Sequence, residues 1–160
     1  MEIYTSKIIS YTQGYMLMRS TSQEYKWNLN YGGVALMWRG GCIIRSIFLG
    51  KIKKAFDENP NLSNLLLDTY FKDQVESAQL AWRCVIATAL QMGIPIPAMS
   101  SALAFFDGYR REWLPANLLQ SQRDYFGAHT YERVEQHHGQ FFYTDCTGHS
   151  GSATSNPYQA

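Results

Sequence analysis

An all-α fold is predicted for this chain of 160 residues, and three features of the sequence support the prediction. Apolar side chains recur at spacings of three and four through most of the first 127 residues, which is the period of an amphipathic helix. No run of alternating apolar and polar residues indicates a strand. Glycine and proline pairs separate the periodic segments, as expected at helix boundaries.

The first three helices are expected in the N-terminal third of the chain. Residues 3–25 place an apolar stripe on one face: Tyr4, Ile8, Tyr11, Tyr15 and Met18. A short helix from Tyr31 to Trp38 or Arg39 has Asn30 as a plausible N-cap, and stops at Gly40-Gly41, where positive φ angles suit a helix end. Residues 42–56 are predicted as a third helix, ended by Asn59-Pro60.

The next helices follow a short apolar turn at residues 62–67. The clearest helical stripe of the chain starts after Asp68 and comprises Phe71, Val75, Ala78, Trp82, Val85, Ile86 and Ala89. Gly93, Pro95 and Pro97 end it. Residues 98–113 keep helical spacing, and Pro115 allows a new helix to start, carrying Leu118, Leu119, Gln122 and Tyr125 or Phe126.

The character of the chain changes after Gly127. Residues 128–160 are rich in glycine, serine and threonine and show no helical period, yet they are too aromatic for an ordinary disordered tail. We therefore expect an all-helical domain at residues 1–127 and an extended C-terminal arm at residues 128–160. The arm is predicted to dock on another surface; the alternative is a frayed tail with incidental aromatics.

The composition excludes several functional classes. With 14 basic and 13 acidic residues the net charge is +1, so no global field attracts nucleic acid or an anionic membrane. Cys42, Cys84 and Cys146 are far apart and form no CxxC pair, which argues against a disulfide framework or a zinc site. The first ten residues lack the apolar core of a signal peptide, and no run approaches the roughly 20 apolar residues of a membrane span. We expect a cytoplasmic protein without a metal.

One stretch, Gln120–Glu132, contains a local grouping suited to an anionic ligand. The guanidinium of Arg123 can hold a phosphate or carboxylate through two parallel hydrogen bonds. His129 can donate to a sugar hydroxyl or a phosphate oxygen. The ordinary alternatives are an arginine paired with a carboxylate and a structural histidine. His137-His138 are expected in a solvated turn, since adjacent histidines do not share a metal in the usual helical spacing.

No catalytic residue or cofactor loop is predicted. No serine, cysteine or threonine has a base at a recognised spacing, and the chain contains neither a GxGxxG nor a GxxxxGK[ST] phosphate loop.

Longer motifs show a family resemblance over essentially the whole chain from about Tyr4. They are SKIISYTQGYMLMR, LNYGGVALMWRGGCIIRSIFLGKI, AFDENP, LLLD, GIPIPAMSSALAFFDGYRRE, LPANLLQSQRDYFGAHTYE and TGHSGS. These closely resemble the C-terminal part of the decarboxylating 6-phosphogluconate dehydrogenases, that is, the second unit of their duplicated helical domain plus their C-terminal tail.

The resemblance implies a function that periodicity does not show. Members of this family oxidise 6-phosphogluconate with NADP and release CO2 to give ribulose 5-phosphate in the pentose phosphate pathway, a route of gluconate utilization. They are homodimers in which the tail threads into the other subunit. The arginine and histidine of the RDYFGAH motif reach the substrate bound in the neighbouring subunit, and these positions are Arg123 and His129 here.

The departures from the family pattern limit this chain. The NADP-binding Rossmann fingerprint and the family's catalytic lysine and glutamate have no counterpart in these 160 residues, so the chain alone is expected to be inactive. Ser150 stands where relatives commonly have glycine.

Three functions are open at this point. The first is the C-terminal portion of the dehydrogenase, which contributes a dimer interface and Arg123 and His129 to the partner subunit's active site. The second is a non-catalytic truncated relative, a dimerisation or interaction module that pairs with full-length subunits or with itself. A free-standing phosphosugar binder is disfavoured, because one arginine and one histidine supply few contacts. An apolar patch is expected where the other helical unit would pack, and self-association should follow.

Overall fold

The computed structural model of this chain describes residues 2–40, 42–44, 46–127 and 129–144. It confirms the all-α fold, since α-helices form every long element in those ranges. The chain divides into two compact units, Met1–Arg110 and Arg111–Ala160. This division falls before the last helix, whereas the domain boundary expected from the sequence lies after residue 127. The last helix groups with the segment that follows it, because hydrogen bonds join the two.

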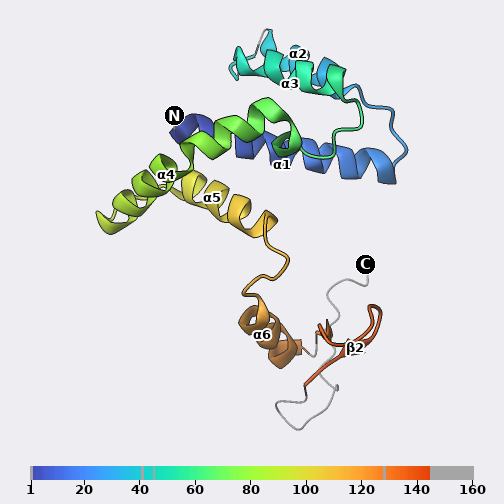
Figure 1. Cartoon of the computed structure of the whole chain (residues 1–160). Helices are drawn as coiled ribbons and strands as arrows, with labels where there is room; N and C mark the ends of the chain where they lie inside the picture. The colour runs from blue at the N-terminus through green and yellow to red at the C-terminus, as the bar shows by residue number, and fades with distance from the viewer. Residues whose placement is uncertain (1, 41, 45, 128, 145–160) are drawn as a thin grey trace. The chain divides into compact units, whose positions relative to one another are not determined.

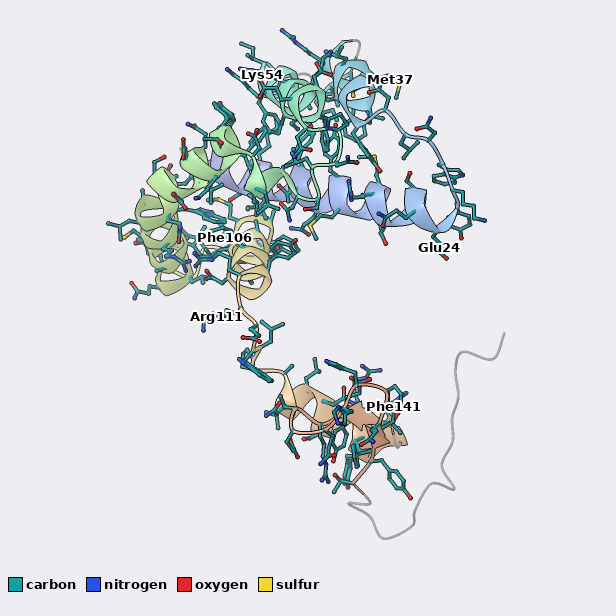
Figure 2. The ribbon with its side chains drawn as sticks, turned by 45° about the vertical axis from the view of Figure 1, so that its right-hand side comes forward. Glu24, Met37, Lys54, Phe106, Arg111 and Phe141 are labelled. Atoms are coloured by element: carbon teal, nitrogen blue, oxygen red, sulfur yellow. The ribbon has the colours of Figure 1, made fainter. Side chains whose placement is uncertain are left out.

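The first unit is built on a long central helix. Its described elements are α1 (Glu2–Glu24), α2 (Tyr31–Arg39), α3 (Phe48–Glu58), the 3-10 helix η1 (Leu65–Leu67), α4 (Thr69–Gln91) and α5 (Pro97–Tyr109). Both α4 and α5 contact α1, and α2 and α3 lie side by side (Figure 1). Figure 2 shows Met37 of α2 and Lys54 of α3 on the outer side of that pair.

Side-chain caps start two of these helices where the sequence predicted them. Asn30 Oδ1 accepts the N–H of Gly33 at 2.8 Å and begins α2. Asp68 Oδ1 accepts the N–H of Phe71 at 3.2 Å and begins α4. At the end of α2, however, Gly40 is extended (φ −109°) and does not have the expected positive φ. The helix start signals are therefore local, and the predicted stop at Gly40 has a different geometry.

The core of the first unit centres on Trp82 of α4. Its side chain is completely buried, its ring packs 6.0 Å from that of Phe106 on α5, and its Nε1 donates to Ser6 Oγ on α1 at 2.8 Å. Figure 2 shows Phe106 on the inner side of α5. Because the indole N–H is paired, Trp82 brings a large apolar ring into the core without leaving a buried donor unsatisfied.

Two predicted helix boundaries are wrong. The third helix begins at Phe48 and not at Cys42, and α5 ends at Tyr109 and not near Trp113. Ile43 and Ile47 are almost fully exposed, and Trp113 is also exposed. The apolar spacing of these segments continues that of the helices, but their side chains have no core to pack on within the unit, so nothing extends the helix through them.

The second unit contains a short helix followed by a small hairpin. Its described elements are α6 (Asn117–Gly127), β1 (Tyr131–Glu132) and β2 (Phe141–Phe142), which pair antiparallel with Tyr131 opposite Phe142. The expected absence of strands is wrong here, because two-residue strands are too short to show alternation. TGHSGS, Cys146, Ser150 and the rest of the predicted arm from residue 145 lie outside the described residues. Over the part of the chain that is described, no helix has the length and apolarity to cross a membrane.

Candidate functional site

The candidate site is on α6 and the loop that follows it. Arg123 lies on α6, as predicted, and its side chain is exposed. Within the described residues its guanidinium has no hydrogen-bonded or ion-paired partner, so the ordinary alternative, an arginine paired with a carboxylate, is not found there. An exposed guanidinium keeps its donors available for a phosphate or carboxylate.

The neighbouring Asp124 has the opposite environment. It is 4% exposed, and its Oδ2 accepts the backbone N–H of Thr144 at 2.7 Å. Its Oδ1 has no hydrogen-bond partner among the described residues. Successive residues of a helix point about 100° apart, so Arg123 and Asp124 can face solvent and the interior of the unit respectively. Asp124 is therefore a structural residue of this unit and does not itself neutralise Arg123.

His129 follows α6 in an irregular loop, as predicted, and is half-buried. Its carbonyl oxygen accepts a hydrogen bond from Gln120 Nε2 at 3.2 Å, and the carbonyl of Thr130 accepts from the same nitrogen at 3.3 Å. The backbone of His129 is thus bound to α6. Among the described residues its imidazole has no hydrogen-bond partner, so the ring is not acting as a structural hydrogen-bonder there.

The hairpin after His129 is closed by its own side chains. Glu132 accepts from His138 Nδ1 at 2.9 Å and from the N–H of Gly139 at 3.1 Å. The hydrogen bond from His138, followed by that from the backbone of Gly139, holds the pKa of the Glu132 carboxyl below its usual value. Gly139 has φ +90°, a conformation that favours glycine. His137-His138 therefore belong to an exposed turn, as expected.

A groove of about 300 Å³ between α6 and the hairpin was not predicted from the sequence. It is lined by Asn117, Gln120, Ser121, Tyr131, Glu132, Arg133, Val134 and Glu135. Neither Arg123 nor His129 lines it. Its two carboxylates and one guanidinium do not favour an anion, so we place the anion-binding residues outside this groove. Glycine at the turn and the aromatic pair Phe141-Phe142 were the available sequence signals for the hairpin that forms one wall.

The chemistry available at the site is that of binding. Arg123 can grip two oxygens of an anion, and the imidazole of His129 can donate to or accept from a hydroxyl or a phosphate oxygen. Over the described ranges no cluster of three or more histidine, cysteine, aspartate or glutamate residues could hold a metal ion. These two groups are of the kind that binds a phosphorylated or carboxylated ligand.

Comparisons with known proteins identify a family for this chain. The family model described as 6-phosphogluconate dehydrogenase, C-terminal domain, matches residues 1–145. The 6-phosphogluconate dehydrogenase, decarboxylating, of Ovis aries is 62% identical over 158 residues, which is 99% of this chain and 32% of that protein. The protein of the same description from Drosophila melanogaster is 61% identical over 158 residues, or 33% of its length.

A solved structure is also similar. The Plasmodium falciparum 6-phosphogluconate dehydrogenase, described in its apo form, in complex with its cofactor NADP+ and in complex with its substrate 6-phosphogluconate, superposes with a TM-score of 0.78 at 44% identity. The similarity covers 89% of this chain and 30% of that one. The chain thus spans about a third of the length of the relatives it matches.

Proposed function

Because this chain belongs to the 6-phosphogluconate dehydrogenase family, whose C-terminal domain it matches, we propose that it acts as the C-terminal portion of an NADP-dependent decarboxylating 6-phosphogluconate dehydrogenase. In this role it contributes the dimer interface, and it supplies Arg123 and His129 to a substrate site whose other residues lie elsewhere. Within the pentose phosphate pathway, the substrate is 6-phospho-D-gluconate and the products are ribulose 5-phosphate and CO2.

The availability of Arg123 is the observation that carries this proposal. Its guanidinium is exposed and unpaired within the described residues, although Asp124 is adjacent in sequence. The substrate carries a phosphate and a carboxylate, and both are anions that a guanidinium binds through paired hydrogen bonds. His129 belongs to the same unit, and its backbone is tied to the helix of Arg123. The two side chains are therefore suited to one anionic, hydroxyl-rich ligand.

NADP is assigned to another part of the enzyme. Bound nicotinamide supplies hydride transfer. The described residues do not fit this cofactor, since they contain no strand, glycine-rich loop and helix in the order that binds a dinucleotide. No step of the redox chemistry is therefore assigned to this chain, and we expect the 160 residues alone to be inactive.

The assembly that completes the site is a dimer. We place the substrate of Arg123 and His129 in the neighbouring subunit, with residues 128–160 as an arm that docks there. The partner is a second copy or a full-length subunit. A cytoplasmic location accords with the free thiols of Cys42 and Cys84.

A chimera tests the role of Arg123. The matched third of the Ovis aries relative is replaced by this chain, and NADPH formation from 6-phosphogluconate is followed. Arg123→Ala should raise KM about tenfold to a hundredfold, because it removes paired charge-assisted hydrogen bonds to the substrate. Arg123→Lys should recover only part of the loss, since an ammonium group cannot form the paired contact.

The matched control is Arg111→Ala, which removes an exposed arginine from the irregular segment before α6. It should leave KM and kcat unchanged. If Arg123→Ala behaves like this control, Arg123 does not contact the substrate and the proposed function of the site is wrong.

A second candidate function is a dimerisation or interaction module without catalysis. The many exposed apolar side chains of both units favour it, because they are suited to a protein interface. An active chimera would support the first function over this one, and an inactive chimera that still forms dimers would support the module.

A further inference from the structure

Two polar residues of α6 hold the segment that contains His129. Gln120 and Asp124 are four residues apart and so lie on one face of the helix. Gln120 Nε2 donates to the carbonyls of His129 and Thr130, at 3.2 Å and 3.3 Å. Asp124 Oδ2 accepts the N–H of Thr144 at 2.7 Å. One residue therefore binds the chain where it enters the hairpin, and the other binds it where the hairpin ends.

Thr144 connects three parts of this unit. Its N–H is bound to Asp124 on α6, and its hydroxyl is hydrogen-bonded to the Tyr131 hydroxyl of β1 at 2.7 Å. It also follows β2 by two residues. A hairpin of two-residue strands is marginal in water by its own backbone bonds. The bonds from α6 and through Thr144 therefore matter for keeping the hairpin on the helix.

The burial of Asp124 indicates that its hydrogen bond to Thr144 contributes to the stability of this unit. A buried carboxylate is costly unless it is hydrogen-bonded, and Asp124 is 4% exposed. Its short bond to the Thr144 N–H is of the charge-assisted kind, which is about twice as strong as a neutral one. An aspartate side chain contributes little to apolar packing at this position. Its contribution is therefore the hydrogen bond that holds Thr144, after the hairpin, against α6.

We propose that Gln120 and Asp124 are positioning residues that fix the location of His129 relative to α6, the helix that carries Arg123. The inference rests on the proposed function, in which Arg123 and His129 contact one substrate. Neither Gln120 nor Asp124 touches the substrate, and both act through the backbone of His129, Thr130 and the hairpin. A displacement of about 1 Å in a binding group can cost up to roughly a hundredfold in rate, so such support affects the site.

Amide hydrogen exchange of the full 160-residue chain tests whether Gln120 and Asp124 hold the hairpin on α6. Asp124→Ala should speed exchange of the Thr144 N–H about tenfold or more, because its acceptor is lost. Asp124→Asn should have a smaller effect, since the amide oxygen still accepts. Gln120→Ala should speed exchange in β1 and β2. The matched control is Gln122→Ala, an exposed glutamine of the same helix, which should change nothing.

Kinetics of the chimera test whether this support affects substrate binding. Gln120→Ala and Asp124→Ala should each raise KM for 6-phosphogluconate about threefold to tenfold, less than Arg123→Ala, with kcat within about twofold. Asp124→Asn should restore most of the lost affinity. A purely structural role would lower the amount of folded enzyme and leave its KM unchanged.

Three results would overturn the proposal. Unchanged exchange of Thr144 in Asp124→Ala would show that the hydrogen bond does not hold the chain. Faster exchange with an unchanged KM, where Arg123→Ala still raises KM, would show that His129 needs no such support. If Arg123→Ala and His129→Ala also leave KM unchanged, the proposed function fails and the positioning role falls with it, although faster exchange would still establish the hydrogen bond itself.

Discussion

At the scale of single residues, two neighbours on α6 have opposite environments. Arg123 is exposed and unpaired within the described part of the chain, while Asp124 is buried and accepts the N–H of Thr144. The effect of a glycine likewise depends on its position, here through the local backbone conformation. Gly14 lies inside α1 with nothing within 4 Å of an added Cβ, whereas Gly139 has φ +90° in the hairpin turn, also with open space around it. There is room for a methyl group at both positions. The backbone conformation accepts an alanine only at Gly14.

Gly14→Ala and Gly139→Ala should therefore have opposite effects. Gly14→Ala should stabilise the first unit by about 0.5–1 kcal/mol, because alanine has the higher helix propensity and meets no neighbour. Gly139→Ala should destabilise the hairpin by about 1 kcal/mol, since an L side chain is strained at positive φ. Thermal unfolding measures the first effect and amide exchange of β1 and β2 the second. Equal signs for the two variants would contradict this account.

At the scale of elements, α4 joins the first unit together. Trp82 connects it to α1 through Ser6, and Arg83 connects it to α5 through a pair of hydrogen bonds to Asp107. Arg110 adds a hydrogen bond to the same carboxylate at 3.2 Å. Asp107 is half-buried and bridges two helices. Consecutive residues of α4 thus make a neutral hydrogen bond to α1 and an ionic connection to α5.

Truncation of Trp82 should be among the most damaging single changes in the chain. Trp82→Ala removes a fully buried indole and should lower the free energy of unfolding by about 3–5 kcal/mol. Trp82→Phe should cost less, because most of the ring volume stays and only the hydrogen bond to Ser6 is lost. Denaturant unfolding measures both. The control is Trp27→Ala, at an exposed indole, and a comparable loss there would refute the assigned core.

The bridge at Asp107 should make the first unit sensitive to acid. The hydrogen bonds and charge of Arg83, and then the hydrogen bond from Arg110, hold the pKa of the Asp107 carboxyl below its usual value of about 3.8. A carboxyl whose pKa is lowered by folding stabilises the protein above its unfolded pKa, and the contribution disappears as the pH falls through the folded pKa.

Asp107→Asn should accordingly lower stability at pH 7 by about 0.5–1 kcal/mol, a modest effect because both partners are about a third exposed to solvent. The difference between the variant and the parent should shrink as the pH falls through the folded pKa of Asp107, because the parent carboxyl then becomes protonated. Thermal unfolding at several pH values measures the difference between the two proteins. A difference that stays constant from pH 7 to pH 2 would exclude an ionic origin.

At the scale of the whole chain, exposed apolar side chains are abundant. On α4, Leu80 and Leu90 are exposed by more than half, and Ile43 and Ile47 before α3 are almost fully exposed. In the second unit, Leu118 and Leu119 of α6 are exposed as well. Monomeric soluble proteins seldom expose contiguous apolar patches larger than a few hundred square ångströms. Exposed apolar side chains of this kind are available for contact with other protein surfaces, as the proposed dimer requires.

The isolated chain should self-associate. Analytical ultracentrifugation over a range of concentrations should show dimers or larger species, because association removes the exposed apolar surface from water. Leu80→Glu should shift the distribution toward monomer, whereas Ser77→Glu, at an exposed polar position of the same helix, should not. A monomer at all concentrations would contradict the pairing of this chain with a second copy of itself, in the proposed dimer and in the interaction module alike.

Local signals in the sequence were sufficient for much of the fold and for part of the site. Asn30 and Asp68 cap helices through their own side chains, and Asn59-Pro60 stops α3. The stripe of α4 from Phe71 to Ile86 is buried as predicted, except Val85. These features depend on residues within one or two turns of each other, so spacing reveals them. Arg123 and His129 were likewise found in the expected helix and loop, and their contact with substrate stays a prediction.

Features that depend on distant partners could not be read from spacing. Ile43, Ile44 and Ile47 continue the helical periodicity but are exposed, and α3 begins later at Phe48. The ladder of the hairpin is too short to show a period, and its place on α6 depends on bonds that span 10 and 20 residues. The pairing of Asp124 with Thr144, and not with Arg123, is such a bond. It leaves the guanidinium available for an anion, because a carboxylate whose oxygen is bound to a distant N–H inside the unit faces away from its exposed neighbour.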